Sequence, residues 1–304
     1  MARSSKAFVD AGVAIALCGL IGCSEAAAPG IDSDRVRAEL AQVGTALAAE
    51  PLAGLAALTG RMQAALSAAG PTPPGALFPP GADGMRFTYA PGTMAYLPAA
   101  GGTDGEVSFE LYRIVPTTIL PELPLTMTGA VRLVQGPVGA IRVTSLEPGF
   151  SLRWTRSSGA SGLELEGEFS PGSPRLTFTA LLPPAGADMV RASIEIVNPA
   201  TGLRYSYRQV VPLGEETALV DISVDHGASL RLFGSYTVRG PDLTVTIAGV
   251  TAARVTLTSR LDVIVTPVAG RMLSASEESV IRQTESLTGP VSAFLTVLAF
   301  PAGS

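Results

Sequence analysis

Apolar residues recur every three to four positions over residues 34–70, which is the spacing of helices that each bury one face. The positions on the expected buried faces are Leu40, Val43, Leu47, Leu55, Leu58, Met62 and Leu66. Pro51 fits only the first turn of a helix, because it has no N–H to donate. The segment is therefore predicted to form two helices that meet near Glu50.

The ends of this helical segment carry their own signals. Asp32 and Ser33 are suitable N-caps for the first helix, and Gly70 followed by Pro71 ends the second. Residues 71–84 then form a stiff, Pro-rich linker. We interpret this linker as the boundary between the helical segment and the rest of the chain.

From residue 85 to residue 304 the apolar period changes to two, which is typical of strands with one buried face. The clearest apolar series contain Val107, Phe109, Leu111, Phe150, Leu152, Trp154, Leu176, Phe178, Ala180, Leu203, Tyr205, Tyr207, Val220, Ile222, Val224, Leu230, Leu232, Leu243, Val245 and Ile247. Clusters of Gly, Pro, Asn and Asp separate these runs and indicate roughly a dozen strands. One helical interruption is expected at about residues 276–287, before a final strand at 291–300.

The alternation predicts antiparallel pairing, with the apolar face of the sheet covered and the other face in water. We expect a mainly β fold: one large antiparallel meander sheet, curved like an open barrel, with the two N-terminal helices. The short connections between runs favour this arrangement, and no internal repeat is visible in the sequence. Two β-sandwiches in tandem are the alternative.

The composition supports an ordered chain and excludes one class of partner. Of the 304 residues, 47% are hydrophobic and 15% charged, so enough apolar surface exists to offset the chain entropy lost on folding. The net charge is −5, and no stripe of basic residues is visible. Binding to nucleic acid is therefore not expected.

The first 23 residues have the three zones of an export signal. Arg3 and Lys6 make the start positive, and residues 11–21 form an apolar core that is too short to span a bilayer. The sequence Leu-Ile-Gly-Cys then occupies positions 20–23. It resembles the lipobox of bacterial lipoproteins, in which an aliphatic and a small residue precede a cysteine that becomes acylated.

This resemblance implies that residues 1–22 are a signal peptide and that Cys23 carries acyl chains. Residues 23–33 would then be a tether, and the protein would meet the membrane through its lipids, since two or more chains anchor a protein firmly. Ser24 after the cysteine favours the outer membrane, with the protein facing the periplasm or the cell surface. An ordinary secretory signal cut near residues 26–28 is the alternative.

The cysteine content agrees with export as a lipoprotein. Cys18 and Cys23 are the two cysteines of the chain, and Cys18 would leave with the signal peptide. No disulfide could then form, because lipid occupies the remaining thiol. Without a free thiol and with one histidine, catalysis by a Cys–His pair and histidine-based metal clusters are excluded for the mature chain.

That histidine, His226, lies between two strong apolar alternations. It could act as a base with Asp225 or Asp221. We favour a hairpin turn without chemistry, in which Gly227 takes the positive φ and His226 is exposed.

Three glutamates, Glu164, Glu166 and Glu168, alternate with apolar residues and Gly in one run. Such a row could bind Ca²⁺ or provide the acid and base of a glycoside hydrolase. A solvated strand face has the same pattern and is the favoured interpretation. Trp154 alternates in phase with core positions, so a core residue is favoured over a sugar-binding platform.

No phosphate-binding loop, zinc-protease motif or dinucleotide fingerprint occurs in the sequence, and we predict neither a cofactor nor a bound metal. We therefore expect a membrane-anchored lipoprotein that binds a partner or serves the structure of the envelope, without being an enzyme. The possible partners are an envelope protein or a lipid. One alternative is a carrier of lipid or acyl chains, by analogy with the curved, helix-closed sheets of lipoprotein-localisation carriers. The other alternative is a carboxylate-dependent hydrolase.

Overall fold

The computed structural model describes residues 31–301, except residues 116, 137–138, 147–149, 160–161, 172–174, 184–188, 213–214 and 259–261. The chain from Ile31 onward forms one compact unit. Its helices are α1 (Ser33–Leu47), α2 (Glu50–Ala68), α3 (Ala275–Ser286) and α4 (Thr288–Leu298), with a short 3₁₀ turn at Pro80–Ala82.

The remaining elements are strands: β1 (Arg86–Ala90), β2 (Ala95–Ala99), β3 (Glu106–Tyr112), β4 (Ile114–Val115), β5 (Leu120–Pro121), β6 (Met127–Val134), β7 (Ala140–Ser145), β8 (Phe150–Gly159), β9 (Gly162–Pro171), β10 (Leu176–Leu182), β11 (Met189–Val197), β12 (Arg204–Pro212), β13 (Ala218–His226), β14 (Ala228–Thr237), β15 (Gly240–Ile247), β16 (Val250–Leu257) and β17 (Val263–Pro267).

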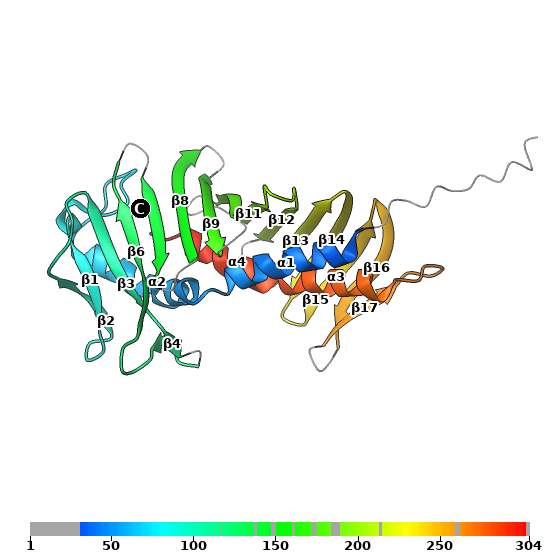
Figure 1. Cartoon of the computed structure of the whole chain (residues 1–304), viewed down its shortest axis with the longest axis horizontal. Coiled ribbons are helices and arrows are strands. Elements are labelled where there is room, and N and C mark those ends of the chain that lie inside the picture. The colour runs from blue at the N-terminus through cyan, green and yellow to red at the C-terminus, as the bar shows by residue number, and fades with distance from the viewer. Residues whose placement is uncertain are drawn as a thin grey trace, which may run out of the picture. The chain divides into compact units, whose positions relative to one another are not determined.

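Fifteen of these strands form one sheet, while β4 and β5 pair separately. From β6 to β17 each strand pairs with the next one along the chain, which is the meander expected from the short connections. β3, β1 and β2 extend the sheet beyond β6, and the β1–β3 pair is parallel, so the sheet is mixed. The sheet is open, with β17 at one edge and β2 at the other (Figure 1). The mainly β prediction is confirmed, and one sheet replaces the alternative of two sandwiches.

The two N-terminal helices form as expected. The Asp32 side chain caps α1 by accepting a hydrogen bond from the Arg35 N–H, at 3.3 Å. Pro51 lies in the first turn of α2, where its missing N–H costs nothing. The apolar positions predicted for both helices are buried.

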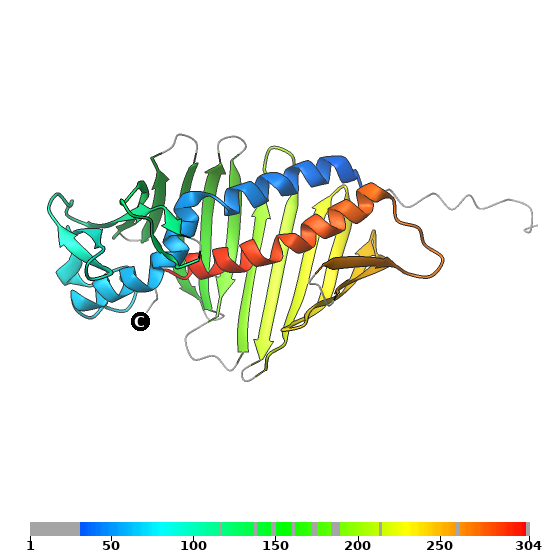
Figure 2. The same cartoon turned by 90° about the horizontal axis from the view of Figure 1, so that it is seen from below.

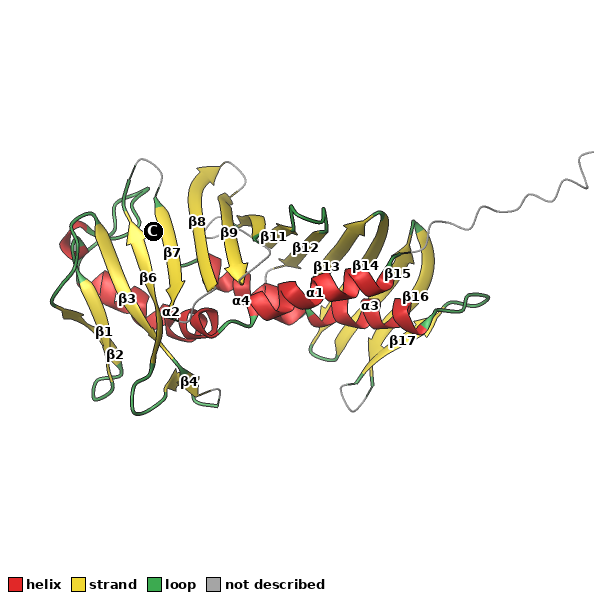
Figure 3. Ribbon diagram, viewed as in Figure 1, coloured by secondary structure: helices red, strands yellow, loops and turns green. Residues whose placement is uncertain are grey.

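The helices cover one face of the sheet, and the core lies between (Figures 2 and 3). α1 packs along α3, and α2 packs on α4 and on β2, β3, β6 and β7. Core residues alternate along the strands as the period of two predicts, with Val107, Phe109 and Leu111 as one fully buried series. The opposite face carries most of the polar side chains, together with exposed apolar residues such as Leu219, Phe233 and Ile264.

The C-terminal end corrects one prediction. The expected helix is present as α3, and Ser274 and Glu277 form a reciprocal capping box at its start. The strand expected at 291–300 is wrong, because α4 occupies most of it. Val291, Phe294, Leu295 and Leu298 are buried at helical spacing in this segment, which is so apolar that a period of two also fits it.

The Pro-rich segment 71–84 lies against the rest of the unit. Leu77 and Phe78 within it are buried, and the Leu77 N–H donates to Gln135 Oε1 at 3.0 Å. Gly81 passes so close to α2 that an added Cβ would lie 2.2 Å from the Ala69 carbonyl oxygen. That this segment separates two cooperative parts stays a prediction.

Candidate functional site

His226, the single histidine, lies at a hairpin turn, but its imidazole side chain is largely buried. Gly227 joins β13 to β14 with a φ of +77°, the conformation that favours glycine. The His226 side chain is only 12% exposed, and its Nε2 lies 3.7 Å from Glu39 Oε1 on α1. The predicted turn is therefore confirmed, whereas the predicted exposure is wrong because α1 packs beside the end of the hairpin.

Glu39 is the centre of a small buried polar cluster. Its carboxylate accepts a hydrogen bond from the Thr201 hydroxyl and lies 3.3 Å from Arg35 Nε. Thr201 belongs to the connection between β11 and β12, so the cluster ties α1 to two hairpins. Asp221, proposed above as a partner of His226, binds Arg231 instead. The cluster has the contacts of a structural tie.

The glutamate row lies on the outer, polar face of β9, as the strand-face interpretation predicts. Glu168 pairs with Arg175, while Glu164 and Glu166 have no ion pair with any described residue. Within the described ranges, no three acidic, His or Cys side chains are close enough to hold a metal ion. Trp154 is fully buried on β8, which agrees with its interpretation as a core residue.

The outer face of the sheet is hollowed above β9–β14, forming what we call the outer groove. It has a volume of about 600 Å³. Its outward-facing residues are Glu164, Glu166, Thr179, Leu181, Ser193, Glu195, Ser206, Arg208, Asp221, Ser223 and Arg231. Strand register places them in continuous rows, because each pairs directly with its neighbour on the next strand. Of this set, sequence reasoning singled out Glu164, Glu166 and Asp221, and none of them as part of a groove.

One end of the outer groove is held in a fixed geometry. Arg231 donates two hydrogen bonds to Asp221, at 2.7 and 2.8 Å, and its guanidinium stacks 5.0 Å from the centre of the Phe233 ring. The hydrogen bonds to Asp221, and after them the negative charge of its carboxylate, raise the pKa of Arg231. The Asp221 and Arg231 charges are thus neutralised by each other.

The unpaired charges of the outer groove are separated by sign. Glu164 and Glu166 on β9 lie at one side, and Arg208, also without an ion pair to a described residue, lies three strands away on β12, opposite Asp221 in the register. Glu164, Leu181, Ser193 and Arg208 occupy one row across the strands. Three strand steps of about 4.8 Å each place the opposite backbones roughly 14 Å apart. The groove therefore presents a negative and a positive group at a defined separation.

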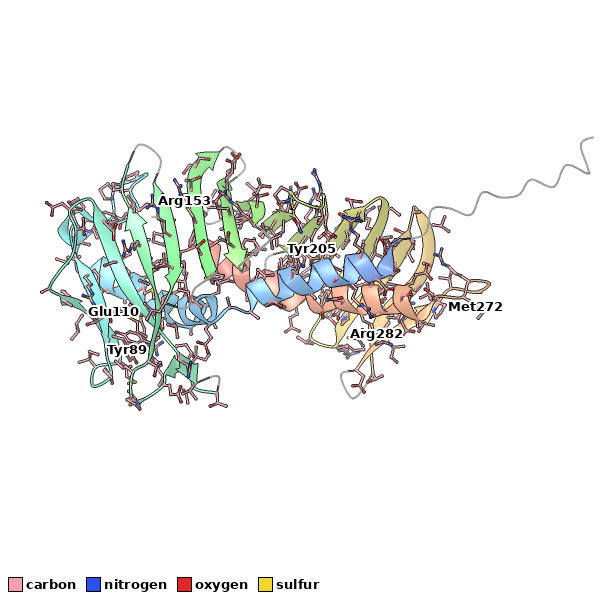
Figure 4. All side chains as sticks on the ribbon, viewed as in Figure 1. Tyr89, Glu110, Arg153, Tyr205, Met272 and Arg282 are labelled. Atoms are coloured by element: carbon pink, nitrogen blue, oxygen red, sulfur yellow. The ribbon has the colours of Figure 1, made fainter. Side chains whose placement is uncertain are left out.

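A second, smaller hollow of about 310 Å³ lies where the α3–α4 junction meets the sheet. Tyr207, Tyr236 and Glu285 line it, and the Tyr236 hydroxyl donates to Glu285 Oε1 at 2.7 Å. Burial raises the pKa of Tyr207 to about 12 and raises the pKa of Tyr236 above its usual range. The neighbouring Tyr205 lies between the sheet and the helices (Figure 4), and its buried hydroxyl has no hydrogen-bond partner among the described residues.

The lipidation residue, Cys23, lies outside the described residues, so its acylation stays a prediction. Among the described helices, none is long and apolar enough by itself to cross a membrane. α1 and α2, which meet at an angle of 45°, would pass that test as a bent pair on length and composition alone. Both are core helices, with their apolar faces buried against the sheet or the other helices.

No protein-family model, curated protein or solved structure matches the chain.

Proposed function

We propose that this protein is a lipid-anchored, non-enzymatic binding protein of the cell envelope, and that its outer groove binds a zwitterionic ligand such as a short peptide. The observation that carries the proposal is the separation of unpaired charges in the groove, with Glu164 and Glu166 on β9 and Arg208 three strands away on β12. The Ser and Thr hydroxyls between them provide donors and acceptors for a polar chain.

The spacing of the groove suits a peptide of about four residues. An extended chain rises by roughly 3.4 Å per residue, so a tetrapeptide separates its amine and carboxylate by about 12 Å. The amine would bind at the glutamates and the carboxylate at Arg208. Charge-assisted hydrogen bonds of this kind are about twice as strong as neutral ones. The strand backbone already orders the protein side, which lowers the entropic cost of binding.

The membrane part of the proposal depends on the signal at residues 1–23. Acyl chains on Cys23 would hold the protein at the outer membrane, facing the periplasm or the cell surface, and the tether 23–33 would join them to α1. The polar outer face of the sheet would then be free to meet a soluble ligand or an envelope partner.

Two alternatives receive less support. A carboxylate-dependent hydrolase needs two carboxylates that converge in a deep cleft, whereas Glu164 and Glu166 stand side by side on the open outer face of one strand. A carrier of acyl chains needs an apolar cavity. The outer groove is lined mainly by charged and hydroxyl side chains, and the smaller hollow of about 310 Å³ carries Tyr207, Tyr236 and Glu285 beside Ala218 and Val220.

The proposal is tested by titrating the acylated protein, held in detergent, with tetraglycine and with tetraglycine blocked at both ends. Free tetraglycine should bind, and blocking its ends should remove the binding. Arg208→Gln should weaken binding by at least about tenfold, since a hydrogen bond to a charged group contributes about 1.5–3 kcal/mol.

The matched control is Arg142→Gln on β7. Arg142 is an exposed arginine of the sheet that also has no ion pair with a described residue, and it lies outside the groove. Equal affinity for free and blocked tetraglycine would refute the proposed charge recognition. An equal loss of affinity in both arginine variants would refute the proposed location.

A further inference from the structure

Met272 is the most exposed large hydrophobic residue in the described part of the chain, with 93% of its surface in water. It lies in the loop of residues 268–274, which joins β17 to α3 and which we call the β17–α3 loop. Figure 4 labels Met272 at the end of the unit, beyond the last strands of the sheet. Single exposed apolar side chains are common on protein surfaces, so the exposure of Met272 points to a partner only together with the structure and the position of its loop.

The β17–α3 loop has a structure that holds Met272 outward. Gly270 takes a φ of +82°, and the Arg271 N–H donates to the Val268 carbonyl at 3.1 Å, which closes a turn. Leu273 on the other side packs against the core, and Ser274 caps α3. The loop is therefore fixed at both ends.

The charge of the loop is already neutralised. Arg271 is the basic residue of the loop, and its guanidinium lies 3.6 Å from the Glu277 carboxylate on α3. The loop thus offers an apolar tip rather than a positive patch. Val250 at the start of β16, another exposed apolar residue, lies near the base of the loop, since the Val268 N–H donates to the Ala252 carbonyl at 3.1 Å. These features suit an apolar surface better than a charged one.

The β17–α3 loop lies at the same end of the unit as the start of α1, the first helix of the chain. α1 packs along α3, and both helices begin at the same end of the unit, beside β16 and β17 (Figures 1 and 2). Ser33 lies ten positions after Cys23. A fully extended chain of that length reaches at most about 35 Å. Acyl chains on Cys23 would therefore keep the membrane near this end.

The opposite edge of the sheet is much farther from the anchor. Fourteen strand-to-strand steps separate β17 from β2. At about 4.8 Å for each step, the two edges are on the order of 65 Å apart along the sheet. If the β17–α3 loop touches the bilayer, exposed apolar residues near β2 are therefore too far away to touch it as well.

We propose that the β17–α3 loop is a membrane-contact site, at which Met272 enters the lipid surface beside the acyl anchor. The inference rests on the proposed acylation of Cys23 and adds to it a second, non-covalent contact. The two contacts together fix the orientation of the unit. The β17 edge faces the bilayer, and the outer groove above β9–β14 stands away from it, open to the aqueous side.

The test uses a single fluorescent probe on the acylated, full-length mature protein in phosphatidylcholine–phosphatidylglycerol vesicles. Because acylation blocks Cys23 and Cys18 is removed with the signal peptide, Met272→Cys provides a unique thiol for an environment-sensitive dye. The matched control is Met94→Cys, at the β1–β2 turn of the opposite edge, where the native side chain is 56% exposed. Both substitutions replace an exposed methionine.

On vesicles, the dye at position 272 should emit at shorter wavelength and several-fold more brightly than it does on the delipidated protein in detergent-free solution. Brominated acyl chains in the vesicles should quench its emission. The dye at position 94 should change in neither respect. If vesicles carry the protein but both dyes behave alike, the loop contact is refuted while the anchor stands. If the protein does not float with vesicles, the anchor fails, and with it the loop contact.

Discussion

Raising the pH should destabilise the protein through the tyrosines buried between the sheet and the helices. Tyr207 is 2% exposed, and burial raises the pKa of its phenol to about 12. Burial also raises the pKa values of Tyr96, Tyr112, Tyr205 and Tyr236. Each phenol is therefore protonated in the folded protein at a pH where the unfolded chain has already lost the proton.

The sign and the size of the effect follow from this difference. An unfolded tyrosine has a pKa of about 10, so the stabilisation is fully present below pH 10 and is lost as the pH rises towards 12. For Tyr207 the difference of about two pKa units corresponds to about 3 kcal/mol, at roughly 1.4 kcal/mol per unit. Because domains are stable by only about 5–15 kcal/mol, a few such tyrosines suffice to unfold this one.

The assay is urea unfolding followed by circular dichroism at several pH values from about 9 to about 12, together with phenolate absorbance. The free energy of unfolding should fall steeply above pH 10, and phenolate should appear together with the loss of β signal. Tyr207→Phe should make the decrease smaller by about 2 kcal/mol by pH 12. Complete ionisation of the tyrosines near pH 10 with an intact β signal would refute the reasoning.

Three further predictions concern single residues. Gly227→Val should lower stability by about 1–3 kcal/mol in thermal melts, because the positive φ strains a β-branched residue. His226→Ala should cost about 1 kcal/mol, because it removes a nearly buried side chain that lies beside Glu39 at 3.7 Å, beyond hydrogen-bond distance. A change below about 0.5 kcal/mol would show that this packing is not stabilising. Gly167→Ala should destabilise the folded protein by about 1–3 kcal/mol, since an added Cβ would lie 2.5 Å from the Arg153 carbonyl oxygen. An unchanged melting temperature would contradict this close packing. Cys23→Ala should abolish metabolic palmitate labelling, and persistent labelling would exclude Cys23 as the acylated residue.

The strands could be predicted from the sequence because alternation is local: a run such as Val107, Phe109 and Leu111 shows its buried face without knowledge of its partners. α4 could not be distinguished from a strand, because its run is apolar on nearly every side. The presence of two N-terminal helices followed from Pro51 and from the apolar spacing. Periodicity thus identifies an element reliably only where one face remains polar.

The candidate site depended on contacts between distant positions. Glu39 and His226 are far apart in the chain, and neither one's surroundings indicate the other. The outer groove depends on the register of successive hairpins, which brings Glu164 and Arg208 into one row. Residue types suggested that the glutamates face water, but only the register shows which positive side chain stands opposite them.

The most direct test of the proposed function is native mass spectrometry of the protein extracted from its own membranes. The account predicts a non-covalently bound, peptide-like ligand with an amine and a carboxylate, which Arg208→Gln loses and Arg142→Gln retains. A non-covalently bound acyl lipid that all three proteins retain would contradict the account and favour a lipid carrier.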